Sequence, residues 1–381
     1  MRAEQNAKGL IPNSLPESRT GSGSPGWGDA RVTIPWDVYV RTGDQRILQD
    51  NYEMMQKWVN AYEIEAKDYI VNRSGFGDWL QPYAKSNKGD TSMALIATAY
   101  FGHCTQILES VAKVLQRESD RKKYQEQYRA IRNAFSKAFF DHQGKCTTEL
   151  QTQTAYLLAL GYNLLLPSQV EGAVKHLLAT LDVAQGHLRT GFLGTPLINS
   201  VLDRYGHPEK SYRLLFKNSY PGWFYSIDQG ATTTWERWNS YSHEHGFGNK
   251  EMNSFNHYAY GAIGQWIQER IAGLAPDPEV PGYKHFFIQP HPEVPLKHAS
   301  YTLDTPYGVA SSSWEKSGRN WIIRATVPPN TSATVILPDV QGNSPELYLG
   351  NKKITMRKVE NHYHYRINPG KTVFRVKDYF D

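Results

Sequence analysis

Glu236 stands between two tryptophans, Trp235 and Trp238, and directly before Arg237. Aromatic rings around a carboxyl group keep water away from it, and enzymes place proton-transfer groups in environments of this kind. Indole rings also offer flat apolar faces that suit the C–H face of a sugar. A second polar and aromatic cluster surrounds His257, and we expect both clusters to line one carbohydrate pocket. The alternative is an interfacial aromatic loop in which Glu236 pairs with Arg237.

Two glycine-rich loops each carry a tryptophan close to an acid. The first loop holds Trp27 and Asp29, and the second holds Asp78 and Trp79. Glycine lets a backbone turn tightly beside a ligand, so we expect the two loops to lie together at the mouth of one site. For the two aspartates a second interpretation stays open, in which their carboxylates cap loop amides beside the sugar.

Other reactive residues give weaker signals. His243 and His245 form a His-x-His pair, which by itself more often lies on a loop than holds a metal ion, so we predict neither a metal site nor a cofactor. The two cysteines have no metal or disulfide spacing. Cys104 lies in an apolar helical stretch, which favours a buried thiol over a reactive one.

The composition narrows the class of partner. Aromatic residues make up 13% of the chain, with 24 tyrosines and 10 tryptophans, and this excess favours a wet binding cleft. The net charge of +5 is small, and no long basic run is present to hold a polyanion, so we predict no nucleic-acid partner. No apolar run reaches the roughly 18 residues of a membrane span, and we predict no membrane partner. Met1 begins a polar stretch without a signal-peptide core, which leaves the cellular location open.

Apolar and charged segments with helical spacing alternate along residues 45–271. The segment from Met93 is apolar nearly all round and follows a capping serine, Ser92, which predicts an inner helix. Residues 1–35 are rich in proline, glycine and serine, so a disordered tail is the default expectation for most of them. Inner apolar helices joined by short loops to outer charged ones predict an α/α toroid, with fewer helices than a complete six-hairpin barrel. The predicted helices are 45–67, 93–116, 120–140, 148–166, 168–183, 196–204, 209–216 and 254–271.

Beyond this region the pattern changes to short, alternating, β-branched segments bounded by turn residues. Such segments predict a C-terminal antiparallel β-sandwich. We therefore divide the chain into a toroidal catalytic domain at 1–275 and a β-sandwich domain at 276–381. The second domain has no paired acids, so we assign it packing and solubility rather than chemistry. The predicted strands are 285–289, 309–314, 321–327, 332–337, 347–349, 363–367 and 372–376.

Several motifs, taken in order, resemble the bacterial α-L-rhamnosidases of glycoside hydrolase family 78. The resemblance runs from about Leu10 to Asp339, and it is specific because many motifs occur at fitting separations. The motifs lie at 26–30, 34–36, 39–44, 77–80, 154–156, 230–238, 256–262 and 305–308.

The resemblance implies an (α/α)6 barrel, incomplete at its N-terminus here, followed by a C-terminal antiparallel β-sandwich. It also implies inverting hydrolysis of terminal α-L-rhamnosyl residues in rhamnose-containing glycosides or polysaccharides. Glu236 resembles the general base that activates water, and His257 resembles a histidine that bonds a ring hydroxyl. Trp27 and Trp79 resemble the indoles that flank the sugar, whose methyl group suits a tryptophan-rich pocket. The other substrate-binding candidates are Asp29, Asp78, Trp235, Arg237 and Trp238.

One motif of the family is missing. Its general acid and further sugar-binding acids precede the loop at Trp27, and nothing in residues 1–26 matches them. We therefore expect a C-terminal portion of a longer enzyme, or a truncated product with impaired hydrolysis. Another toroidal enzyme, such as a glucoamylase-like hydrolase or a polysaccharide lyase, and a non-catalytic carbohydrate-binding fragment are the alternatives.

Overall fold

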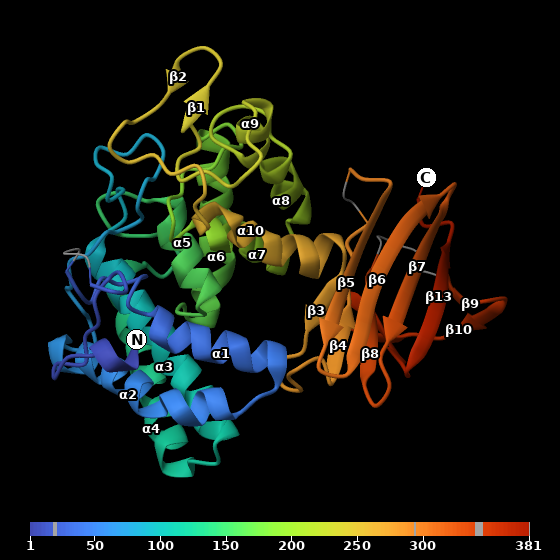
Figure 1. Cartoon of the computed structure of the whole chain (residues 1–381), viewed down its shortest axis with the longest axis horizontal. Coiled ribbons are helices and arrows are strands. Elements are labelled where there is room, and N and C mark those ends of the chain that lie inside the picture. The colour runs from blue at the N-terminus through green and yellow to red at the C-terminus, as the bar shows by residue number, and fades with distance from the viewer. Residues whose placement is uncertain (18–20, 293–294, 340–345, 381) are drawn as a thin grey trace. The chain divides into compact units, whose positions relative to one another are not determined.

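The structure is a computed structural model that describes residues 1–17, 21–292, 295–339 and 346–380. The chain forms two compact units, one made of Met1–Trp36 and Gln45–Ile263 and the other of Asp37–Asp44 and Gly264–Asp381. Helices dominate the first unit and strands the second (Figure 1). The domain boundary at residues 275 and 276 stays a prediction.

The helical unit is built from hairpins of consecutive helices. The pairs α3 and α4, α5 and α6, and α7 and α8 pack against each other, and α3 also contacts α2 and α5. This arrangement matches the predicted inner and outer helices, since α3 buries an almost continuous apolar surface and α4 buries one stripe. The helices are α1 (Ala30–Thr42), α2 (Arg46–Glu65), α3 (Met93–Val114), α4 (Glu118–Phe139), α5 (Gln153–Gly161), α6 (Pro167–Val183), α7 (Thr195–Arg204), α8 (Pro208–Leu215), α9 (Trp223–Asp228) and α10 (Ile263–Trp266), with the short helices η1 (Arg2–Glu4), η2 (Ala259–Ala262) and η3 (Ile267–Ile271).

Local sequence signals explain where the long helices begin. The Ser92 hydroxyl accepts a hydrogen bond from the Leu95 amide at the start of α3, and the Thr152 hydroxyl accepts one from the Ala155 amide at the start of α5. Proline opens α6, where its missing N–H costs nothing because the first amides of a helix have no partner within it.

Among the described residues, no helix is both long and apolar enough to cross a bilayer.

Two predictions for the helical unit were wrong. The described residues of the proline- and glycine-rich N-terminal segment, 1–17 and 21–35, are held by hydrogen bonds within the helical unit: Arg31 donates to the Gly9 carbonyl and the Ser24 amide donates to the Asn13 side chain. Its last residues also begin α1, which continues through Pro35. Residues 254–258 are not helical, because their backbone groups bond to the segment around Glu236 instead.

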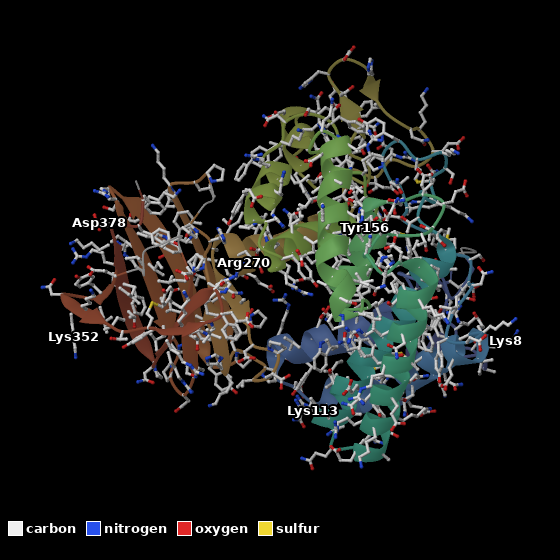
Figure 2. All side chains as sticks on the ribbon, turned by 180° about the vertical axis from the view of Figure 1, so that it is seen from behind. Lys8, Lys113, Tyr156, Arg270, Lys352 and Asp378 are labelled. Carbon is white, nitrogen blue, oxygen red and sulfur yellow. The ribbon has the colours of Figure 1, made fainter. Side chains whose placement is uncertain are left out.

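The second unit contains two sheets, with strand orders β10-β9-β13-β7-β6-β5 and β11-β12-β8-β4-β3. Among the described strands, all pairs in these two sheets are antiparallel except β4 with β8, so the predicted antiparallel sheet domain is confirmed with one parallel pair. Buried residues such as Trp314, Trp321 and Phe286 form its core, whereas Lys352 projects from an edge strand (Figure 2). The strands are β3 (Leu274–Pro276), β4 (His285–Ile288), β5 (His298–Thr305), β6 (Gly308–Ser317), β7 (Asn320–Val327), β8 (Ser332–Pro338), β9 (Glu346–Leu349), β10 (Lys352–Ile354), β11 (Arg357–Val359), β12 (His362–Ile367) and β13 (Gly370–Lys377), while β1 (Tyr241–Ser242) and β2 (Gly246–Phe247) form a hairpin in the helical unit.

Candidate active site

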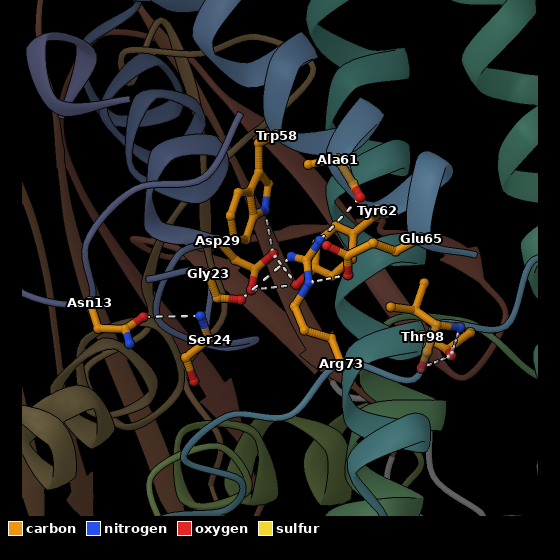
Figure 3. Close-up of polar contacts among 11 residues, drawn as sticks. Asn13, Gly23, Ser24, Asp29, Trp58, Ala61, Tyr62, Glu65, Arg73 and Thr98 are labelled. Carbon is orange, nitrogen blue, oxygen red and sulfur yellow. Dashed lines mark hydrogen bonds and ion pairs between the residues drawn. The ribbon is translucent and has the colours of Figure 1, made fainter. Parts of the chain in front are cut away.

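Asp29 is buried beneath the loop that carries Trp27, with 1% of its surface exposed. Its carboxylate accepts hydrogen bonds from the Gly26 amide at 2.7 Å, the Trp58 indole at 2.8 Å and the Tyr62 hydroxyl at 3.2 Å. Figure 3 shows Asp29 facing both aromatic side chains of α2. Burial raises the pKa of Asp29, and the bonds from Trp58 and Gly26 act against this rise. The carboxylate therefore fixes the turn before Trp27 from inside the protein.

Asp78 has the same role beneath the second loop. It is fully buried, and its oxygens accept from the Gly191 amide at 2.7 Å, the Leu193 amide at 2.9 Å and the Gly194 amide at 3.1 Å. The Thr154 hydroxyl donates to it at 2.5 Å. Burial raises the pKa of Asp78, and these donors lower it. For both aspartates the geometry favours the capping interpretation over direct contact with a sugar.

The two loops lie side by side, as the sequence predicted. The Ser24 hydroxyl of the first loop accepts a hydrogen bond from the Phe76 amide of the second at 2.9 Å. The Phe76 ring lies between the two indoles, 5.0 Å from that of Trp27 and 5.4 Å from that of Trp79 between ring centroids. Gly77 is required here, because it has φ +68° and a Cβ would lie 2.1 Å from the Lys88 carbonyl oxygen. Trp27 and Trp79 therefore belong to one partly exposed aromatic surface.

Phe192 extends this surface to His257. The Phe192 amide donates to the Trp79 carbonyl at 2.9 Å, and the Phe192 ring lies 5.0 Å from the His257 imidazole. The Ala259 amide donates to Nδ1 of His257 at 3.3 Å, which makes Nδ1 an acceptor and places the proton of a neutral ring on Nε2. Nε2 has no partner among the described residues, so His257 offers a free N–H donor.

The segment that carries Glu236 pairs with the segment that carries His257 through backbone hydrogen bonds. The Glu236 amide donates to the Ser254 carbonyl at 2.9 Å, and the His257 amide donates to the Thr234 carbonyl at 2.8 Å. The Ser254 amide also donates to Oε2 of Glu236 at 2.8 Å. Within the described part of the chain this is the one hydrogen bond to the carboxylate, so Oε1 is available to a water molecule.

Arg237 does not pair with Glu236. Its guanidinium donates to the Met252 carbonyl at 3.0 Å, and the alternative of an ion-paired surface loop is therefore not supported. Trp235 and Trp238 are buried, with 7% and 4% of their surfaces exposed, and Trp238 stacks on Tyr260 at 3.9 Å.

A cavity of about 330 Å³ adjoins this stretch and is lined by Trp235, Trp238 and Tyr260, but not by Glu236 or His257. Among the described residues, the carboxylate oxygen and the histidine N–H that have no protein partner belong to Glu236 and His257, which do not line this cavity. We therefore take the group formed by Trp27, Trp79, Phe192, Glu236 and His257 as the chemical site. The five residues come from segments far apart in the sequence.

Comparison with known proteins agrees with this arrangement. Residues 1–271 match the bacterial alpha-L-rhamnosidase 6 hairpin glycosidase domain, and residues 273–347 match the bacterial alpha-L-rhamnosidase C-terminal domain. This chain belongs to the bacterial alpha-L-rhamnosidase family. The predicted family and the six-hairpin helical fold are thereby confirmed.

Relatives in the rhamnosidase family are much longer than this chain. An alpha-L-rhamnosidase of Formosa agariphila is 47% identical over 361 residues, which are 94% of this chain and 38% of that relative. One from Streptomyces avermitilis is 37% identical over 89% of this chain and 32% of the relative. The chain thus spans well under half of these proteins.

Solved rhamnosidase structures have the same fold. The Streptomyces avermitilis alpha-L-rhamnosidase complexed with L-rhamnose superposes with a TM-score of 0.90 at 34% identity, over 99% of this chain and 35% of that one. The alpha-L-rhamnosidase from Dictyoglumus thermophilum superposes with a TM-score of 0.88 at 31% identity, over 99% of this chain and 42% of that one.

Sequence reasoning missed Phe192 and Ser254. Phe192 stands between Gly191 and Gly194, so it repeats the glycine and aromatic pattern of the Trp27 and Trp79 loops, and this signal was available. Ser254 acts through its backbone amide, which every non-proline residue has, and no residue type could have revealed it.

Proposed function

We propose that this chain carries the water-activating side of an α-L-rhamnosidase active site, for inverting hydrolysis of terminal α-L-rhamnosyl residues. The observation that carries the proposal is the backbone pairing that joins the segment of Glu236 to the segment of His257. One carboxylate oxygen and one imidazole N–H have no protein partner among the described residues, while backbone amides fix the other side of each group.

Each residue has a separate task in this mechanism. Oε1 of Glu236 accepts a proton from the attacking water, and Oε2 stays fixed by the Ser254 amide. Nε2 of His257 donates to a ring hydroxyl and so orients the sugar. The partly exposed indoles of Trp27 and Trp79 cover the apolar face and methyl group of a 6-deoxy sugar.

Inversion also needs a second carboxyl group, about 6.5–9.5 Å from the first, to protonate the leaving oxygen. Asp29 and Asp78 do not suit this task, since both are buried and bonded to several protein donors. We assign the general acid to neither residue. Because acid–base assistance contributes about 10²–10⁴-fold, we expect this chain alone to hydrolyse aryl α-L-rhamnosides slowly.

The test compares wild type with Glu236→Gln, measuring release of nitrophenol from an aryl α-L-rhamnoside and binding of L-rhamnose by tryptophan fluorescence. We expect E236Q to lose about 10²-fold or more in turnover and to keep its affinity for rhamnose. Glu244→Gln is the matched control, because Glu244 is exposed in the turn between β1 and β2.

Equal turnover of E236Q and E244Q would refute the role of Glu236 as the base. If wild type binds rhamnose but turns over no substrate, the chain is a carbohydrate-binding portion of the enzyme. If wild type does not bind rhamnose at all, the proposed site is wrong.

A further inference from the structure

A polar cavity of about 550 Å³ lies in the β-strand unit, where the sequence predicted no chemistry. It opens where β4, β8 and β12 lie next to one another in the five-stranded sheet. Its lining is dominated by hydrogen-bonding and charged side chains, among them Lys284, His285, Asn330, Ser332, Arg366 and Asn368. A pocket for an apolar molecule would be lined mainly by hydrophobic side chains, so this cavity suits a polar ligand.

The single acid of the lining, Asp277, is committed to the protein. Its Oδ2 lies 2.8 Å from Nδ1 of His285, and Nε2 of His285 lies 2.9 Å from the Thr334 hydroxyl. Both ring nitrogens and one carboxylate oxygen are therefore occupied. Thr334 does not line the cavity. We therefore interpret Asp277, His285 and Thr334 as a structural hydrogen-bonded group and not as a catalytic triad.

Lys284 and Arg366 are the two positively charged residues of the lining, and they hydrogen-bond to uncharged groups. The Lys284 ammonium donates to the Asn330 carbonyl, and the Arg366 guanidinium donates to the Ser332 hydroxyl at 3.2 Å. Within the part of the chain that the structure describes, neither makes an ion pair with a carboxylate. They come from the loop before β4 and from β12, so two positive charges from separate segments converge on one cavity.

The uncharged side chains of the lining indicate which class of negatively charged ligand would bind between the two cations. The side-chain amides of Asn330 and Asn368 and the hydroxyl of Ser332 can donate to and accept from sugar hydroxyls. The Lys284 ammonium also lies 5.0 Å from the centre of the Tyr307 ring, so an aromatic face adjoins the cation. The volume far exceeds what an isolated sulfate or phosphate ion needs.

We propose that this cavity binds an acidic saccharide, with its carboxylate or sulfate ester between Lys284 and Arg366 and its hydroxyls on the asparagine amides. The site is separate from the group around Glu236, and its existence does not depend on the proposed hydrolysis. It would give the β-strand unit a substrate-holding role, by binding charged sugars of the same glycan.

The test titrates the whole chain with methyl α-D-glucuronide and with methyl α-D-glucoside, which differ in the carboxylate, and with inorganic sulfate. Binding is followed by NMR of each probe at low ionic strength. We expect saturable binding of the glucuronide, at least about tenfold weaker binding of the glucoside, and weakening of the glucuronide complex by added salt.

The double variant Lys284→Gln/Arg366→Gln should weaken glucuronide binding about tenfold or more. Lys352→Gln/Arg375→Gln is the matched control, since it removes the same charge from exposed positions on the other sheet. Equal binding of glucuronide and glucoside, or equal effects of the two double variants, would overturn the site. Sulfate binding as tight as that of the glucuronide would overturn the assignment to a saccharide.

Discussion

Thr154→Val tests whether buried Asp78 organises the aromatic wall of the site. Valine has nearly the shape of threonine, so the change removes the hydroxyl that donates to Asp78 at 2.5 Å and little else. Both residues have 0% of their surface exposed, and no water can replace the lost donor without rearrangement.

The magnitude follows from what remains around the carboxylate. A hydrogen bond to a charged group contributes about 1.5–3 kcal/mol. Amides of Gly191, Leu193 and Gly194 still donate to Asp78 in the variant, so the loss should lie in the lower part of this range. We expect about 2 kcal/mol, which is roughly a 30-fold change in the folding equilibrium.

The assay is urea unfolding of the helical unit, combined with hydrogen exchange of the peptide that spans residues 190–194. Thr105→Val is the control, because Thr105 is equally buried but donates to the neutral Phe101 carbonyl in its own helix at 2.7 Å. We expect faster exchange at residues 190–194 in T154V only.

The cost of T154V should also depend on pH. Burial raises the pKa of Asp78, and losing the Thr154 donor raises it further, so the variant is penalised most where Asp78 is charged. The difference from wild type should shrink as pH falls through the raised folded-state pKa of Asp78, which lies above the ordinary aspartate value of 3.8. If T154V costs no more than T105V, or its cost does not depend on pH, Asp78 does not hold the loop as described.

Two further predictions concern the helical unit. Burial lowers the pKa of His103 to about 4 from an ordinary value of 6.5, so the stability that its neutral ring provides is present above pH 6.5 and is lost as pH falls toward 4. His103→Phe keeps the stacking on Tyr162 at 3.9 Å and should gain about 2 kcal/mol relative to wild type between about pH 7 and pH 5 in urea titrations, whereas parallel pH profiles would contradict this. Gly77→Ala should cost at least about 2 kcal/mol and weaken rhamnose binding, because of the positive φ and the contact with Lys88. Gly230→Ala has a positive φ but no atom within 4 Å and should cost about 1 kcal/mol, so similar losses in both would exclude the steric argument.

Helices with local signals could be predicted from the sequence. Ser92 and the apolar run after it identified α3, because capping and burial act within one segment. The beginning of the last predicted helix, 254–271, was different. Ser254 and His257 take part in backbone pairing with Glu236 and Thr234, and this long-range pairing overrides the local helical pattern of residues 254–258. Strand β5 was also missed, although its more and less exposed residues alternate as they do in a strand.

The candidate site was partly predictable because the residues proposed to contact the sugar have distinctive side chains. Trp27, Trp79, Glu236 and His257 were all singled out, and the structure brings them into one connected group. The sequence did not decide the roles of Asp29 and Asp78. An aspartate beside glycines is expected both where the carboxylate binds a sugar and where it caps loop amides. Only their burial and the directions of the donors distinguish the two interpretations.

Because Asp29 and Asp78 are buried and hold the loops, substitutions of these two acids should affect folding more than substitutions of the partly exposed rings do. Partly exposed rings, such as Phe76 and Phe192, belong to loops that the buried Asp29 and Asp78 hold through hydrogen bonds to loop amides. To test which sugar the proposed site accepts, protein engineers could randomise these partly exposed rings while keeping both acids and their glycine neighbours constant. In libraries that also vary the two acids, a variant could lose binding either because it folds poorly or because its sugar preference has changed. The selected variants would then be harder to interpret.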